Sequence, residues 1–86
     1  MESYKAGILK KICYSTLVYE RINKKLKIHF SAEEIEKMIL ETLTETPESQ
    51  FIKTGKNIYV SNYEKNMRIT VNSNTYRLIT VDKIKN

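Results

Sequence analysis

The stretch MRITVNSNTYRLITV, residues 67–81, decides the fold, because apolar and polar side chains alternate on both sides of a short polar break. Alternation with a period of two is typical of a β-strand with one buried face. Residues 50–60, QFIKTGKNIYV, repeat this arrangement around a tight turn that contains glycine. The two pairs, joined by SNYEKN, predict a four-stranded antiparallel meander in residues 49–84.

The expected turns assign each side chain to a face, because directly opposed residues share a face. Closing the first hairpin at its Thr-Gly pair places Phe51 opposite Ile58, and closing the second at its Ser-Asn pair places Val71 opposite Tyr76. The predicted core face then holds Phe51, Ile58, Val60, Met67, Ile69, Val71, Tyr76 and Leu78. The predicted second face holds Gln50, Ile52, Asn57, Tyr59, Arg68, Thr70, Asn72, Thr75, Arg77, Ile79 and Val81.

The first half of the chain, residues 5–46, has apolar residues at helical spacing. One set ends at Cys13, and after the break YST a second set runs from Leu17 to Leu26, with Thr16 as the expected N-cap of that second helix. A third helix is expected to begin at Ser31, where an S-x-x-E capping box is followed by an apolar face. It should end near Thr46, because the residue before a proline is disfavoured in helical geometry.

These patterns predict an α+β fold in which two or three N-terminal helices pack on a four-stranded antiparallel meander sheet. At 86 residues the chain is expected to be one domain, 1–86. Its single cysteine, Cys13, allows no intramolecular disulfide and fits a reducing compartment. We find no signal-peptide pattern and no apolar run of membrane-span length, so we expect a cytoplasmic protein without a membrane partner.

Charge is unevenly distributed along the chain. Residues 3–29 hold seven basic residues and one acidic residue, residues 31–48 hold six acidic and one basic, and residues 49–86 hold seven basic and two acidic. Such a dipolar molecule attracts phosphate or an acidic protein surface to its basic parts. The simpler alternative is a solvated lysine-rich surface, because charge runs usually only face water.

The second sheet face is the candidate binding surface. We predict that it engages RNA or an acidic protein surface, or mediates homodimer formation, without catalysis. Arginine and lysine would contact phosphate, while tyrosine would stack on a base. The predicted surface consists of Lys53, Lys56, Asn57, Tyr59, Arg68, Thr70, Arg77 and Ile79.

Other kinds of site have little support in the sequence. The chain has no Gly-rich nucleotide motif and no His/Cys cluster, so neither a cofactor nor a metal is expected. The glutamates of AEEIEKMILE are expected to favour the helix dipole and face solvent. His29, the one histidine, precedes the third helix and is expected to lie away from the sheet face.

Three segments carry a resemblance to a known family. TGKNIYVSN and RITVNSNTYRLITVDKI, preceded by LVYERINKKL, resemble small bacterial proteins grouped as domain of unknown function 3781, over about residues 8–84. The resemblance implies no defined activity. The family pattern has an aromatic residue after G-K-N and a histidine near the end of the last strand, where this chain has Ile58 and Asp82.

A weaker fold-level likeness connects the chain to ribonuclease toxins of the RelE and barnase type, in which N-terminal helices pack on a four-stranded antiparallel sheet. It implies an alternative function, metal-independent RNA cleavage. That chemistry needs a base, an acid and cations around the reacting phosphate. Arg68 and Arg77, with Lys53 and Lys56, would supply the cations, and Tyr59 would stack or hold a proton.

Overall fold

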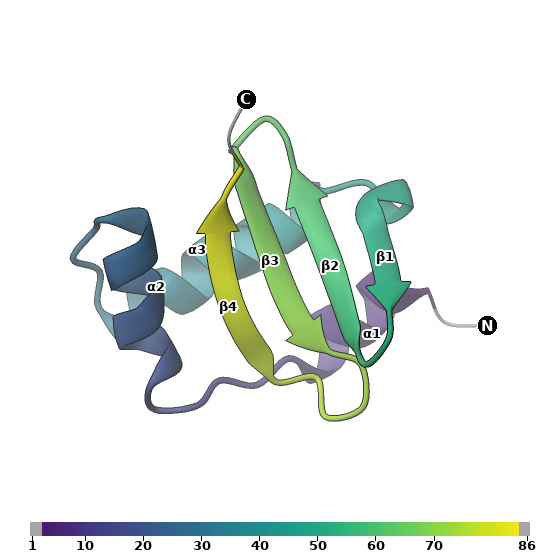
Figure 1. Ribbon diagram of the computed structural model, residues 1–86, viewed down its shortest axis with the longest axis horizontal. Coiled ribbons are helices and arrows are strands. Elements are labelled where there is room, and N and C mark those ends of the chain that lie inside the picture. Colours follow the sequence, from purple (N-terminus) through teal and green to yellow (C-terminus); the bar gives the residue numbers. More distant parts are fainter. Residues whose placement is uncertain (1–2, 85–86) are drawn as a thin grey trace.

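The computed structural model describes residues 3–84, in which three helices precede four strands (Figure 1). The helices are α1, Tyr4–Lys11, α2, Val18–Leu26, and α3, Ala32–Glu45. A 3-10 turn, η1, covers Glu48–Gln50 and leads into the strands β1, Phe51–Thr54, β2, Asn57–Asn62, β3, Met67–Asn72, and β4, Leu78–Lys83. The strands pair antiparallel in the order β1-β2-β3-β4. The predicted α+β class and meander topology are therefore confirmed.

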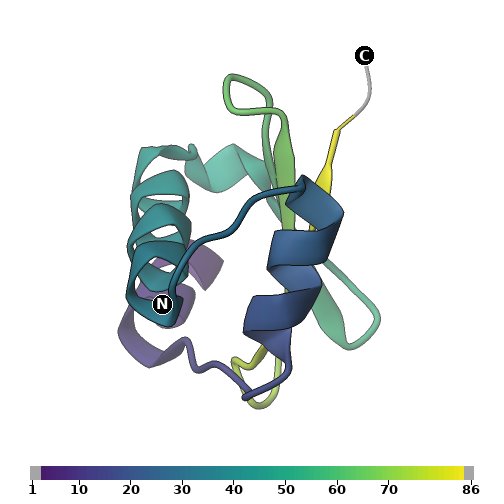
Figure 2. The same cartoon turned by 90° about the vertical axis from the view of Figure 1, so that its left-hand side faces the viewer.

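The helices cover one face of the sheet and leave the other open. In Figure 1, α1 and α3 lie behind the sheet and α2 runs beside β4, an arrangement that Figure 2 shows from the side of α2. Among the described residues, no element lies over the face turned toward the viewer in Figure 1. A single core fills the space between the helices and the covered face, and its buried members are Ile8, Val18, Ile22, Leu26, Ile35, Ile39, Leu43, Phe51, Ile58, Val60, Met67, Ile69, Val71, Leu78 and Val81.

The start of α3 is as predicted, whereas the start of α2 is not. The Ser31 hydroxyl accepts a hydrogen bond from the Glu34 amide at 3.2 Å, and the Glu34 carboxylate accepts one from the Ser31 amide at 2.9 Å. These bonds lower the pKa of Glu34. The predicted N-cap at Thr16 is wrong, because α2 begins after Leu17 without a side-chain cap and a backbone turn from Ser15 satisfies the Val18 amide.

Both hairpins pair differently from the predicted registers. The first turns at Gly55 and Lys56, so Phe51 lies opposite Val60 and not Ile58. Gly55 has a φ of +62°, a left-handed conformation that glycine adopts without strain. The shift is two residues, so every β1 side chain keeps its predicted face.

The second hairpin has a longer loop than predicted. The Asn72 side-chain oxygen accepts hydrogen bonds from the amides of Asn74 and Thr75, at 2.8 and 2.9 Å, which fixes a turn after β3. Tyr76 then adopts a left-handed φ of 58°. As a result Val71 pairs with Leu78, whereas the predicted partner, Tyr76, lies in the loop.

A β-bulge in β4 reverses the predicted face of Val81. The register shifts between Thr70 and Val71, so β4 has one extra residue, Ile79, between two successive pairs of the ladder. Thr80 consequently pairs with Thr70, and Val81 pairs with Ile69. The assignment of Val81 to the second face is wrong, since it is a fully buried core residue.

Two backbone hydrogen bonds attach the helical half to the last strand. The Cys13 amide donates to the Tyr76 carbonyl at 3.0 Å, and the Leu78 amide donates to the Cys13 carbonyl at 2.9 Å. This parallel bridge joins Cys13 to the strand position of Arg77, outside the four-stranded sheet. It therefore occupies part of the exposed edge of β4, which would otherwise present unpaired backbone groups.

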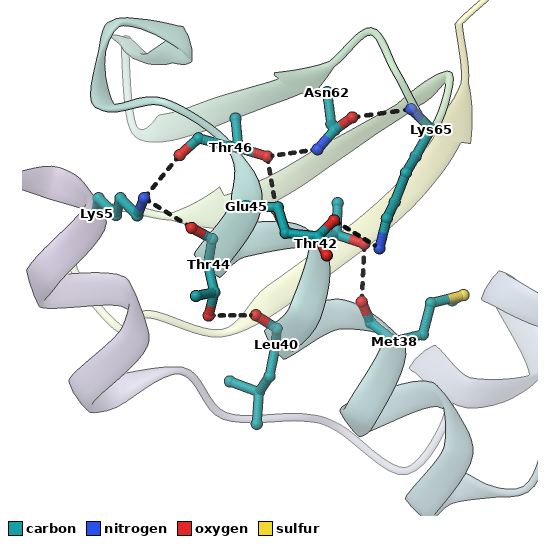
Figure 3. Close-up of polar contacts among 9 residues, drawn as sticks. All are labelled: Lys5, Met38, Leu40, Thr42, Thr44, Glu45, Thr46, Asn62 and Lys65. Atoms are coloured by element: carbon teal, nitrogen blue, oxygen red, sulfur yellow. Dashed lines mark hydrogen bonds and ion pairs between the residues drawn. The ribbon is translucent and has the colours of Figure 1, made fainter.

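A polar network closes the C-terminus of α3 (Figure 3). The Lys5 ammonium of α1 donates to the carbonyls of Thr44 and Thr46, both at 2.9 Å. The buried Thr46 hydroxyl donates to the Thr42 carbonyl and accepts from the Asn62 amide at 3.0 Å. A cation at a helix C-terminus is favourable because the last carbonyls carry partial negative charge. The network thus fixes α1, α3 and the end of β2 to one another.

The face reversal at Val81 can be tested by a matched pair of substitutions. Val81→Ala should lower the free energy of unfolding by roughly 2 kcal/mol, because it removes two buried methyl groups and leaves a cavity. Ile52→Ala should change it by no more than about 0.5 kcal/mol, because Ile52 is 56% exposed. Urea denaturation measures both values, and equal costs for the two variants would contradict the observed register.

Candidate functional site

One row of side chains crosses the centre of the open face. It consists of Ile52, Tyr59, Thr70 and Thr80, which are successive partners across the four strands. Thr70 is only 5% exposed although it lies on the face that no described helix covers. Ile52, at the outer strand, is 56% exposed. The row is therefore flat in the middle and ends in an accessible apolar side chain beside Tyr59.

The next row contains an arginine. Arg68 lies between its strand partners Ser61 and Asp82. Its Nε donates to the Ser61 hydroxyl at 3.2 Å, whereas Asp82 forms an ion pair with Lys25 of α2 at 2.7 Å. Within residues 3–84 the Arg68 guanidinium forms no ion pair, so its terminal nitrogens are available to an anion.

A groove connects the arginine to two tyrosines. It has a volume of about 360 Å³ and lies on the β1–β2 side of the open face. Tyr63, which follows β2 and is 58% exposed, forms part of its wall. Strand alternation does not identify Tyr63, because this residue follows the end of β2. The groove is lined by Gln50, Ile52, Thr54, Tyr59, Ser61, Tyr63 and Arg68.

The structure brings together four of the eight predicted binding residues. Asn57, Tyr59, Arg68 and Thr70 share the open face, and the Asn57 amide donates to the Tyr59 hydroxyl at 3.4 Å. The other four residues lie elsewhere and do not join this cluster.

Each of those four residues lies at a different place in the fold. Lys53 lies opposite the core residue Ile58 and so belongs to the helix-facing side. Lys56 is in the first turn, and Arg77 is at the Cys13 bridge. Ile79 lies at the bulge, where its carbonyl accepts a hydrogen bond from Arg21 of α2 at 3.3 Å. Arg68 is consequently the predicted cation that the structure places in one groove with Tyr59.

A second polar cluster lies on the helical side. The rings of Tyr14 and Tyr19 stack with centroids 5.9 Å apart, and the Tyr19 hydroxyl donates to the Glu36 carboxylate at 3.0 Å. The Tyr14 hydroxyl is buried and has no hydrogen-bond partner among the described residues. Burial, reinforced by the nearby Glu36 and Tyr19, raises the pKa of Tyr14 to about 12. This cluster packs the α1–α2 connection against α3.

The comparisons with known proteins concern nearly the whole chain. The family model described as "Protein of unknown function (DUF3781)" matches residues 6–82. The chain belongs to this family. No curated protein and no solved structure matches it, so the predicted likeness to ribonuclease toxins gains no support. Among the residues that the structure describes, no helix of this family member has both the length and the apolar character needed to cross a membrane.

The Tyr14 site predicts a specific dependence of stability on pH. The folded-state pKa is above the unfolded value of 10.0, so folding favours the protonated hydroxyl. The stability that depends on the protonated Tyr14 hydroxyl is fully present below about pH 10 and is lost as the pH rises toward 12. The free energy of unfolding of Tyr14→Phe should therefore fall less than that of the wild type as the pH rises from about 10 to 12. Urea denaturation at several pH values measures this difference.

At neutral pH the same variant should be at least as stable as the wild type, because the hydroxyl it removes is buried without a partner in the described structure. Tyr63→Phe is the matched control, since Tyr63 is exposed. A neutral-pH loss for Tyr14→Phe, or identical alkaline profiles of the two variants, would show that the Tyr14 hydroxyl is not buried as described.

Proposed function

We propose that the protein is a non-enzymatic binding module that takes single-stranded RNA on the open face of its sheet. The observation that carries the proposal is the Arg68 guanidinium, free of ion pairs within residues 3–84, in one groove with Tyr59 and Tyr63. The guanidinium contacts a phosphate, and the tyrosines stack on bases. Both contacts are independent of sequence, because every nucleotide offers a phosphate and a flat ring.

The chemistry of the groove favours this ligand. Stacking of a base on an aromatic side chain contributes roughly 1–3 kcal/mol. Ser61 and Thr70 are short and nearly buried, so they leave the middle of the face flat between the larger side chains. The net charge of +5 attracts a polyanion from a distance. Few contacts are offered, so the affinity should be modest and sensitive to salt.

An acidic protein surface is the competing ligand, because Ile52 gives the groove an exposed apolar end beside the arginine. Such a composition is also found at protein interfaces. Two features favour RNA. The groove contains two tyrosines for one aliphatic residue, and apart from Arg68 its polar lining consists of hydroxyl and amide groups. No observation favours RNA cleavage, since His29 lies in the α2–α3 connection and the Asp82 carboxylate is held by Lys25.

Binding to a fluorescent oligouridine tests the proposal by anisotropy across a salt series. Arg68→Gln should lower the affinity and reduce the slope of log affinity against log salt by about 0.7, the value for one phosphate contact on a single strand. Tyr63→Ala should lower the affinity with little change of slope, because it removes stacking and no charge. Lys53→Gln is the matched control, since it removes the same charge from the helix-facing side.

The expected result is a loss for Arg68→Gln and Tyr63→Ala together with wild-type affinity for Lys53→Gln. Equal losses for Arg68→Gln and Lys53→Gln would mean that only net charge attracts the RNA. Undetectable binding at low salt by folded protein would overturn the proposal and leave a protein partner for this face.

A further inference from the structure

A second concave site lies at one end of the core, between the α2–α3 connection and the β2–β3 turn. Its volume is about 480 Å³, within the range of small-molecule sites. Most of its wall is apolar and comes from both layers of the fold: Leu26, Ile28, Phe30, Met38, Met67 and Ile84. None of these residues lines the open-face groove, so the two sites are separate.

Hydrogen bonds to backbone groups fix the walls of this cavity before any ligand enters. The side-chain amide of Asn23 bonds both the amide and the carbonyl of Phe30, each at 3.0 Å, and so holds the α2–α3 connection. Across the cavity, the Ile84 amide donates to the Asn66 carbonyl at 2.9 Å and holds the end of β4 against the β2–β3 turn. A preformed site loses little conformational entropy when it binds.

Two lysines line the cavity, and among the described residues only one of them forms an ion pair with an acidic side chain. Lys65 forms an ion pair with Glu45 at 3.1 Å (Figure 3). Lys83 lies opposite Met67 in the sheet, on the same side as the apolar wall, and forms no ion pair within residues 3–84. The cavity therefore combines an apolar interior with one uncompensated positive charge.

We propose that this cavity binds an amphipathic monoanion, an aliphatic chain that ends in a carboxylate. The chain occupies the apolar interior, where the unbranched side chains of Met38 and Met67 adapt to its shape. The carboxylate lies beside Lys83. A cationic or uncharged head group leaves that charge unmatched, and a purely polar anion leaves the apolar wall exposed.

A chain-length series of simple carboxylates tests the proposal. Hexanoate, octanoate and decanoate, each kept below its micelle concentration, are titrated into the labelled protein and followed by amide NMR shifts. Affinity should rise roughly fourfold per added methylene while the chain is being buried, and stop rising once the cavity is full. The shifted amides should be those around Phe30, Met67 and Ile84. Octanol and octylammonium should bind more weakly than octanoate.

Two variants test the charge and the apolar interior separately, and a third serves as the control. Lys83→Met should reduce octanoate affinity to that of octanol, whereas Lys53→Met, which removes a lysine outside the cavity, should leave it unchanged. Met38→Trp should weaken both ligands by filling the interior. Octylammonium binding as tightly as octanoate, shifts away from the cavity, or no binding to folded protein would overturn the proposal. None of these outcomes bears on RNA binding at the open face.

Discussion

The two backbone hydrogen bonds that join Cys13 to Tyr76 and Leu78 attach the helical half to the sheet, and they bring α1 against the loop before β4. They place α1 so close to the loop before β4 that a Cβ on Gly7 would lie 3.3 Å from the Tyr76 hydroxyl. The Lys11 ammonium lies 5.4 Å from the centre of the same ring. The left-handed backbone of Tyr76 is thus held by contacts from a segment more than sixty residues earlier.

This attachment also accounts for the free arginine of the open face. Because the chain leaves the bridge at Cys13 and enters α2 beside β4, Lys25 reaches Asp82. Asp82 is the strand partner of Arg68, but the ion pair it forms is with Lys25. The contact of α2 with β4 therefore pairs the carboxylate beside Arg68 with a lysine.

Local signals in the sequence were sufficient for the fold class. The Ser31–Glu34 capping box and the proline at 47 fixed α3, and the period of two fixed the four strands, because each depends on neighbours in the chain. The errors concern interactions that local patterns do not encode. Val81 is in the core because of a bulge, and the left-handed residue that lengthens the second loop is held by α1.

The candidate site was only partly predictable for the same reason. Strand alternation was enough to place Tyr59, Arg68 and Thr70 on one face. It gave no information about which acidic residue pairs with which cation, since the contact of Lys25 with Asp82 joins residues from different halves of the chain. Tyr63 reaches the groove from a turn, where alternation no longer applies.

The most direct test of the central claim is an amide NMR map of the protein titrated with oligouridine at low salt. If the open face is the binding surface, the perturbed amides will cluster on β1, β2 and β3 around Ile52, Tyr59 and Arg68, and those of α1 and α3 will stay unchanged. Perturbations confined to the basic residues of α2, or spread evenly over all lysines, would contradict the claim that the uncovered face of the sheet is the functional surface.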